Sequence, residues 1–82
     1  MTSVLKNIEA LIDAGGGISI DTLSPELCVA AASDGSNCLA MLRRRQGESL
    51  DKLLKRLDVA IALAWFDEIF TDEVNEPPRQ SR

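Results

Sequence analysis

The sequence predicts a small α+β domain on three observations. Apolar residues spaced three and four apart predict one helix near the N-terminus, and the same spacing after residue 50 predicts a longer one. Between them, two short apolar runs flank Asp34-Gly35, a dipeptide typical of a tight hairpin turn. A chain of 82 residues is one domain at most. We expect residues 1–74 to form it and residues 75–82 to be a disordered C-terminal tail, because that end is polar and rich in proline.

The N-terminal helix is expected from about Thr2 to Ala14. Its apolar residues form one stripe, made by Val4, Leu5, Ile8, Leu11 and Ile12. Gly15, Gly16 and Gly17 then end the helix, since glycine readily adopts the positive φ of a helix stop. No lysine-serine or lysine-threonine pair follows these glycines and no strand precedes them, so they do not match a phosphate-binding loop.

The residues after the glycines carry two local signals. Ile18 and Ile20 alternate with polar residues, as in a short strand. Pro25, directly after Ser24, instead resembles the start of a helix. This segment therefore adds either a strand or a short helix to the fold.

The apolar runs around Asp34-Gly35 also have two interpretations. We favour a two- or three-stranded antiparallel hairpin from about Cys28 to Arg43. In the alternative, Gly35 ends one helix and Ser36 caps the next, which gives an all-α domain of four short helices.

The hairpin interpretation fixes the expected positions of the two cysteines. A symmetric two-residue turn places Ala31 opposite Cys38 and Cys28 opposite Met41. Side chains alternate along a strand, so the two cysteines point to opposite faces and form no disulfide with each other. We expect both to be buried as small apolar side chains.

The C-terminal helix begins after Ser49, whose hydroxyl can cap the first turn. One face carries Leu50, Leu53, Leu54, Leu57, Ile61 and Trp65. A second apolar stripe, nearly opposite the first, carries Val59, Leu63, Phe66, Ile69 and Phe70. A helix that is apolar on both sides must be covered twice. We expect either the N-terminal helix or a second copy of the chain, in a two-fold dimer, to cover the second stripe.

The net charge of −4 hides a strong asymmetry. A basic segment from Arg43 to Arg56 carries +4, because six basic residues there outnumber two acids, and the rest of the chain carries −8. The six are Arg43, Arg44, Arg45, Lys52, Lys55 and Arg56. Many of the acids lie in a second cluster, made by Asp67, Glu68, Asp72, Glu73 and Glu76.

The basic segment has two possible partners. It could contact the phosphates of a nucleic acid, but Trp65 and two phenylalanines offer few aromatic rings to stack on bases. An acidic protein surface fits better, including the acidic C-terminal end of this protein or of a neighbouring copy.

Residue types argue against catalysis and metal binding. The chain has no histidine and two cysteines, which excludes the usual zinc sites and the common nucleophile-base pairs. We therefore expect no enzyme activity, no cofactor and no metal. The longest apolar run, Val59 to Phe66, is far shorter than the roughly 20 residues of a membrane span. The N-terminal segment contains acids and no signal-peptide pattern, so we expect a cytoplasmic protein without membrane contact.

The stretch LRRRQGESLDKLLKRLDVAIALA followed by FTDEVN resembles short uncharacterised bacterial proteins, often encoded near mobile or phage-derived genes. The resemblance covers Met41 to Asn75, in four parts: Arg43 to Arg45, Gly47-Glu48-Ser49, Arg56-Leu57-Asp58, and Asp72-Glu73-Val74-Asn75. It implies no activity, cofactor or catalytic residue. Together these observations predict a non-enzymatic, homodimeric accessory or adaptor protein. The alternatives are a nucleic-acid-associated protein that uses the basic segment, or an inhibitor encoded by a mobile element.

Overall fold

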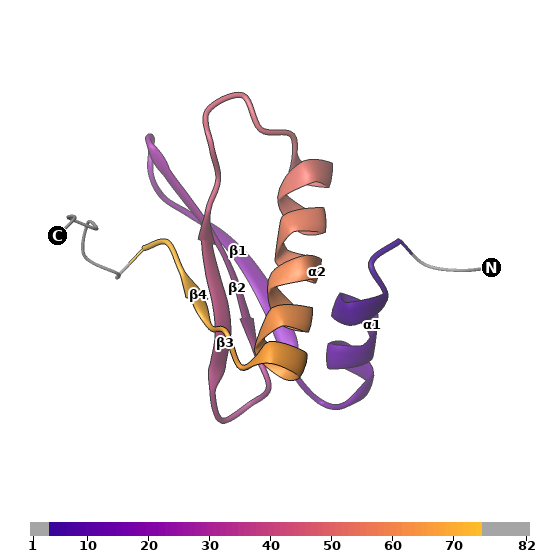
Figure 1. Ribbon diagram of the computed structural model, residues 1–82. Helices are drawn as coiled ribbons and strands as arrows, with labels where there is room; N and C mark the ends of the chain where they lie inside the picture. The colour runs from indigo at the N-terminus through magenta and orange to yellow at the C-terminus, as the bar shows by residue number, and fades with distance from the viewer. Residues whose placement is uncertain (1–3, 75–82) are drawn as a thin grey trace, which may run out of the picture.

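The computed structural model describes residues 4–74 and confirms the α+β class (Figure 1). Two helices pack on a four-stranded mixed sheet. In chain order the elements are α1 (Lys6–Asp13), β1 (Gly17–Ser24), β2 (Leu27–Ser33), β3 (Cys38–Arg43), α2 (Leu50–Asp67) and β4 (Thr71–Asp72). The expected tail, residues 75–82, lies outside the described residues.

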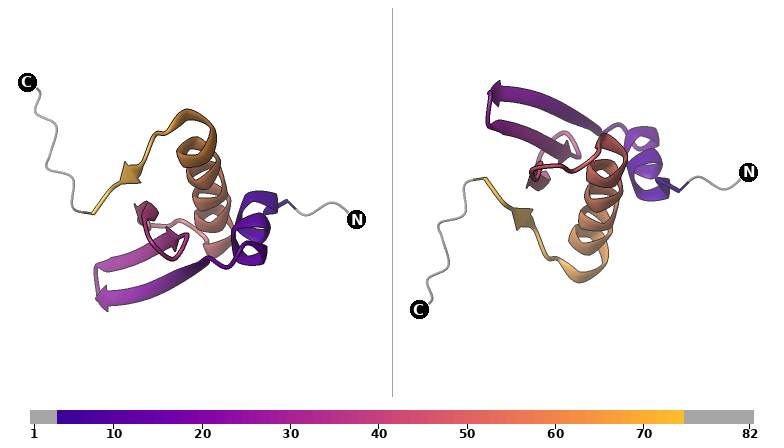
Figure 2. Two further views of the ribbon diagram at one scale, coloured as in Figure 1. Left: turned by 90° about the horizontal axis from the view of Figure 1, so that it is seen from below. Right: turned by 90° about the horizontal axis from the view of Figure 1, so that it is seen from above.

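The molecule has two layers, because α1 and α2 lie on the same side of the sheet (Figure 2). The strands follow the order β1-β2-β3-β4; the first three are antiparallel, and β4 runs parallel to β3. Within the described residues no helix covers the other face of the sheet. The sequence did not predict β4, because its two residues are too few for an alternating pattern.

The predicted hairpin is present as β2 and β3, and β1 adds a further antiparallel strand. The all-helical alternative is therefore wrong. The interpretation of Ser24-Pro25 as a helix start is also wrong, because Pro25 and Glu26 turn the chain from β1 into β2.

The predicted pairing of β2 with β3 is wrong in register. Ala31 lies opposite Met41, and Ser33 lies opposite Cys38. The turn spans residues 34–37, where Asp34 Oδ1 accepts the backbone N–H groups of residues 36 and 37 at 2.9 and 2.7 Å. A four-residue turn and a shift in register next to it displace the pairs that a symmetric two-residue turn would give.

The cysteines follow the prediction only in part. Cys28 and Cys38 are both free, as expected. Cys28 is half-buried, but Cys38 is exposed, so its predicted burial is wrong. Cys38 begins β3 at the shifted end of the hairpin, outside the core.

The core lies between α2 and the sheet. Leu53, Leu57 and Ile61 of α2 have no exposed surface. They belong to one cluster with Ala30 and Ala32 of β2, whose small side chains let the helix approach the strands closely. Each buried leucine or isoleucine contributes about 1.5–3 kcal/mol relative to an exposed one. Leu50 and Trp65, predicted on the same face, are 49% and 36% exposed at the two ends of α2.

The helix ends differ from the prediction by a few residues. Helix α1 begins at Lys6 and buries Ile8 and Leu11, while Val4 is exposed. It stops before the three glycines, as predicted. Gly16 is required there by packing, because a Cβ atom would lie 2.5 Å from the carbonyl oxygen of Ser33.

The start of α2 is confirmed and its end is not. Ser49 caps the helix, since its hydroxyl accepts the backbone N–H of Lys52 at 3.1 Å. The helix ends at Asp67, because Glu68 takes a left-handed conformation with φ of 57°. Ile69 and Phe70 therefore follow the helix instead of lying on its second stripe. Neither helix of the described chain has the length and apolar character that crossing a membrane requires.

Candidate functional site

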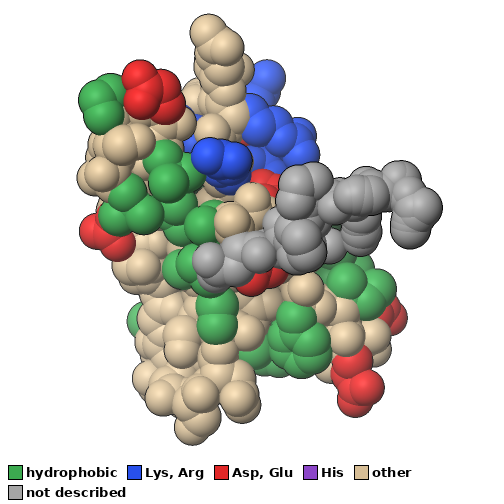
Figure 3. Space-filling model, turned by 90° about the vertical axis from the view of Figure 1, so that its left-hand side faces the viewer, with side chains coloured by type: hydrophobic (Ala, Val, Ile, Leu, Met, Phe, Trp, Pro, Cys, Tyr) green, Lys and Arg blue, Asp and Glu red, His purple; other side chains and the backbone are tan. Residues whose placement is uncertain are grey.

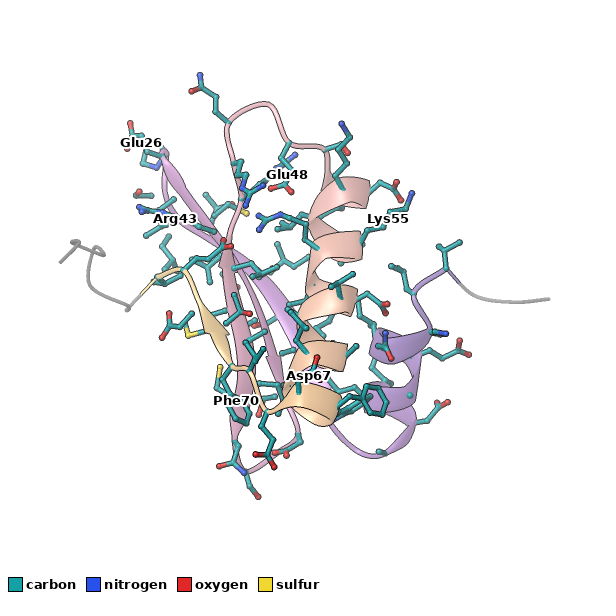
Figure 4. All side chains as sticks on the ribbon, in the orientation of Figure 1. Glu26, Arg43, Glu48, Lys55, Asp67 and Phe70 are labelled. Carbon is teal, nitrogen blue, oxygen red and sulfur yellow. The ribbon has the colours of Figure 1, made fainter. Side chains whose placement is uncertain are left out.

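Three charged side chains join the N-terminal half of α2 to the rest of the fold. Arg56 of α2 donates from Nε to Glu48 Oε2 at 2.7 Å and from Nη1 to Glu73 Oε2 at 3.0 Å. Its Nη2 donates to the carbonyl oxygen of Arg43 at 2.9 Å. We call Glu48, Arg56 and Glu73 the Arg56 clasp; Figure 4 shows Glu48 beside the first turns of α2.

The Arg56 clasp fixes β4 and the loop before α2. Glu73 Oε1 accepts the backbone N–H of Arg43 at 2.9 Å, and the Glu73 N–H donates to the carbonyl oxygen of Met41 at 2.8 Å. Glu48 Oε1 accepts the backbone N–H of Arg45 at 2.9 Å. The clasp therefore ties three separate segments to one guanidinium.

The charges of the clasp stabilise one another. The side chain of Glu48 is only 7% exposed, and the hydrogen bond from Arg56 lowers its pKa to about 2 despite the opposing effect of burial. The same hydrogen bond raises the pKa of Arg56 above its ordinary value. Both groups stay charged at neutral pH, and the clasp is a structural ion-pair network.

The structure does not bring the six predicted basic residues together as one contact surface. Arg56 is used within the clasp, and Lys55 pairs with Asp51 at 3.1 Å on the exposed side of α2. Arg44 donates from Nε to the carbonyl oxygen of Glu48 at 2.8 Å. The arginines of the 43–45 stretch and Lys52 are exposed. In Figure 3 the visible lysine and arginine side chains lie in the upper part of the view.

A buried carboxylate that the sequence reasoning missed holds α1 against α2. Asp58 is 7% exposed, and its Oδ1 accepts the backbone N–H groups of Asn7 and Ile8, each at 2.8 Å. Its Oδ2 accepts a third hydrogen bond, from Asn7 Nδ2 at 3.0 Å. Leu5, at the cap position of α1, provides no side-chain cap. Asp58 therefore supplies from another helix the cap that α1 lacks.

The second apolar stripe is the largest predicted feature that remains exposed. Val59 is 57% exposed and Phe66 is 75% exposed, with the half-buried Leu63 between them on the outer side of α2. The prediction that the N-terminal helix covers this stripe is wrong, since α1 packs beside α2 at Asp58. Ile69 and Phe70 are 51% and 58% exposed beyond the helix end. We call Val59, Leu63 and Phe66 the outer face of α2.

The outer face of α2 borders a groove of about 380 Å³ between α2 and β4. Val59 and Leu63 form one wall of the groove, and Thr71 lies on the β4 side. Leu42 and Ala60 line it from the core. The groove extends the apolar surface of the helix toward the edge of the sheet.

A second hollow lies at the C-terminal end of α2. It has a volume of about 680 Å³ and is lined by residues of α2, of the link to β4 and of the β2–β3 hairpin. These include Asp34, Leu39, Ala64, Trp65, Glu68 and Phe70, and we call the space the Trp65 hollow. Figure 4 shows Asp67 and Phe70 at this end of the molecule, opposite Glu48 and Arg43.

The described residues contain no group of three or more histidine, cysteine, aspartate or glutamate side chains that could hold a metal ion. Comparisons with protein-family models, with curated proteins and with solved structures give no match to this chain.

Proposed function

We propose that this protein is a non-enzymatic accessory or adaptor protein of the cytoplasm that acts as a homodimer through the outer face of α2. The observation that supports this most directly is the exposure of Val59 and Phe66 on one side of a helix whose other side packs into the core through Leu53, Leu57 and Ile61. Exposed contiguous apolar surface of this kind marks a protein-protein contact more often than chance. A domain of 82 residues also gains stability from a partner subunit.

When the two-fold axis is perpendicular to α2, pairing of the outer faces places the two α2 helices antiparallel. Such an arrangement sets Val59 of one copy against Phe66 of the other, with Leu63 of both copies near the axis. Side chains three, four and seven residues apart lie on one helix face, which is the spacing that helix pairing requires.

The charges of α2 also favour the antiparallel pair. Lys52 and Lys55 lie in the N-terminal half of the helix, and Asp67 and Glu68 lie at its C-terminal end. In an antiparallel pair the basic half of one copy lies beside the acidic end of the other. Complementary charges then set the register and speed association.

The proposal is tested by sedimentation equilibrium across the micromolar range. We expect a dimer for the wild-type protein and a monomer for Phe66→Asp, because a buried unpaired carboxylate opposes the contact. Leu23→Asp is the matched control: Leu23 is 63% exposed, and it lies at the tip of the β1–β2 hairpin, so this variant should remain a dimer. A wild-type monomer of 8.9 kDa at all concentrations would contradict the proposal.

The exposed basic side chains support a second candidate function, the binding of nucleic acid. Arg43, Arg45 and Lys52 are exposed, and the basic side chains visible in Figure 3 lie in the upper part of the view. Phosphate contacts predict binding to random duplex DNA that weakens steeply with salt. Replacing all three arginines of the 43–45 stretch by glutamate should abolish such binding, while Phe66→Asp should leave it intact.

A further inference from the structure

The Trp65 hollow has the size of a small-ligand site. Its volume of about 680 Å³ lies within the range of roughly 300–1,000 Å³ that is typical of ligand pockets. Two segments that are distant in the sequence form its apolar part, since Leu39 comes from β3 and Ala64 from α2. Both of these residues belong to the buried core, so this side of the hollow is fixed by the fold.

Two aromatic side chains line the hollow and remain accessible. Trp65 is 36% exposed, and Phe70, from the link between α2 and β4, is 58% exposed. The face of an aromatic ring carries partial negative charge, which attracts cations such as ammonium and guanidinium groups. The surface of the hollow therefore offers a cation both apolar contact and electrostatic attraction.

Two carboxylates complete the hollow. Asp34 lies in the β2–β3 turn and Glu68 follows α2, so they reach it from different segments. Hydrogen bonds from the backbone of residues 37 and 36 lower the pKa of Asp34, so this group is charged at neutral pH. None of the ion pairs found among the described residues involves either carboxylate, and no described lysine or arginine lines the hollow.

The face of the molecule that Figure 3 shows has the same polarity. Its lysine and arginine side chains lie in the upper part of the view, and the charged side chains in the lower half of the view are acidic. A surface region of one sign raises the local concentration of ligands of the opposite sign.

The ligand class follows from these groups. A metal ion such as Ca²⁺ takes about six to eight oxygen ligands. The described residues bring too few carboxylates together to supply them. An organic cation instead needs apolar contact for its alkyl groups and a few negative charges nearby. We propose that the Trp65 hollow binds an organic cation, an alkylammonium or guanidinium group, between Trp65 and Phe70 and beside Asp34 and Glu68.

The only tryptophan of the chain lines the hollow, so its fluorescence reports binding directly. The first titration compares choline with 3,3-dimethylbutan-1-ol, its uncharged analogue of similar shape, at constant ionic strength. We expect a saturable change in Trp65 fluorescence with choline, with an affinity at least about fivefold higher than for the alcohol. Equal binding of both compounds, or no saturable change with choline, would overturn the proposal.

Conservative variants locate the site. Phe70→Leu keeps an apolar side chain but removes the ring, and Glu68→Gln removes only the charge; each should weaken choline binding about threefold to tenfold. Phe66→Leu is the control, because Phe66 contacts Trp65 edge to face at 6.4 Å but does not line the hollow. An affinity that falls equally in all three variants would contradict the assignment.

A second titration separates the two sources of such a cation. An acetylated, amidated Gly-Arg-Gly peptide carries the guanidinium on a peptide chain. Tighter binding of the peptide than of choline assigns the hollow to a side chain of a protein partner, and the reverse assigns it to a free small molecule. The proposal is independent of dimerisation, because Phe66→Asp should retain choline binding even where it abolishes the dimer.

Discussion

The two ends of α2 differ in how many contacts their side chains make within the protein. At the N-terminal end, Arg56 contacts two carboxylates and a backbone carbonyl, and Ser49 caps the first turn. At the C-terminal end, Phe66 and Phe70 are mostly exposed, and no described ion pair involves Asp67 or Glu68. The N-terminal end contributes to folding through internal contacts, whereas the C-terminal end leaves large apolar side chains exposed.

This difference reverses the interpretation that residue types alone suggest. A run of basic residues usually indicates an external electrostatic contact, and apolar residues on a helix usually indicate a core. Here Arg56 makes its ion pairs inside the fold, whereas Val59 and Phe66 of the outer face of α2 are mostly exposed.

Arg56→Met should lower the free energy of unfolding by about 3 kcal/mol, because it leaves the Glu48 and Glu73 carboxylates without their cation. Lys55→Met, at the preceding residue, is the matched control. Both side chains of its ion pair with Asp51 are exposed, so the loss of this pair should lower the free energy of unfolding by less than about 0.5 kcal/mol. Urea unfolding of both variants measures the difference. Equal losses would show that the Arg56 clasp does not stabilise the fold.

Asp58→Ala should lower the free energy of unfolding by about 2 kcal/mol, because two backbone N–H groups of α1 lose their acceptor. Hydrogen exchange should show the α1 amides exchanging faster than those of α2. Asp67→Ala removes an exposed carboxylate from the same helix and should change stability by less than about 0.5 kcal/mol. Unchanged protection of α1 in Asp58→Ala would contradict the capping role.

Acid should weaken the clasp end of the molecule through Glu48. The pKa of Glu48 is about 2 in the folded protein against an ordinary value of 4.5, so the folded state favours the ionised form. This stabilisation is present above pH 4.5 and is lost as the pH falls toward 2. Urea unfolding between these pH values should show a smaller loss of stability for Glu48→Gln than for the wild-type protein. If the free energy of unfolding fell equally with pH in Glu48→Gln and in the wild-type protein, this role of Glu48 would be excluded.

The sequence predicted what depends on local pattern. The two helices, the Ser49 cap and the chain reversal at Asp34-Gly35 each arise from residues within a few positions of one another. The same periodicity predicted the second apolar stripe, but it did not decide whether the N-terminal helix or a second copy of the chain covers that stripe.

The contacts that the sequence did not specify residue by residue join distant parts of the chain. Asp58 caps a helix 51 residues away, and nothing in the sequence predicted this contact. Glu73 reaches Arg56 across 17 residues; the sequence predicted that the basic segment could meet the acidic C-terminal end, but not which two residues pair. No periodicity records such pairs, and both residues resemble ordinary acids of a helix or its end. The Trp65 hollow was missed for the same reason, since a turn, a strand, a helix end and a link together form it.

The smallest expected effect on stability comes from the exposed end of α2. Phe66→Ser should change the free energy of unfolding of the monomer by less than about 0.5 kcal/mol, because a side chain that is 75% exposed leaves no cavity when it is removed. In the proposed dimer, however, the wild-type unfolding midpoint should rise with protein concentration, since only the folded chain associates. The unfolding midpoint of Phe66→Ser should not change with protein concentration. A loss of about 2 kcal/mol at every concentration would show instead that Phe66 packs within its own chain.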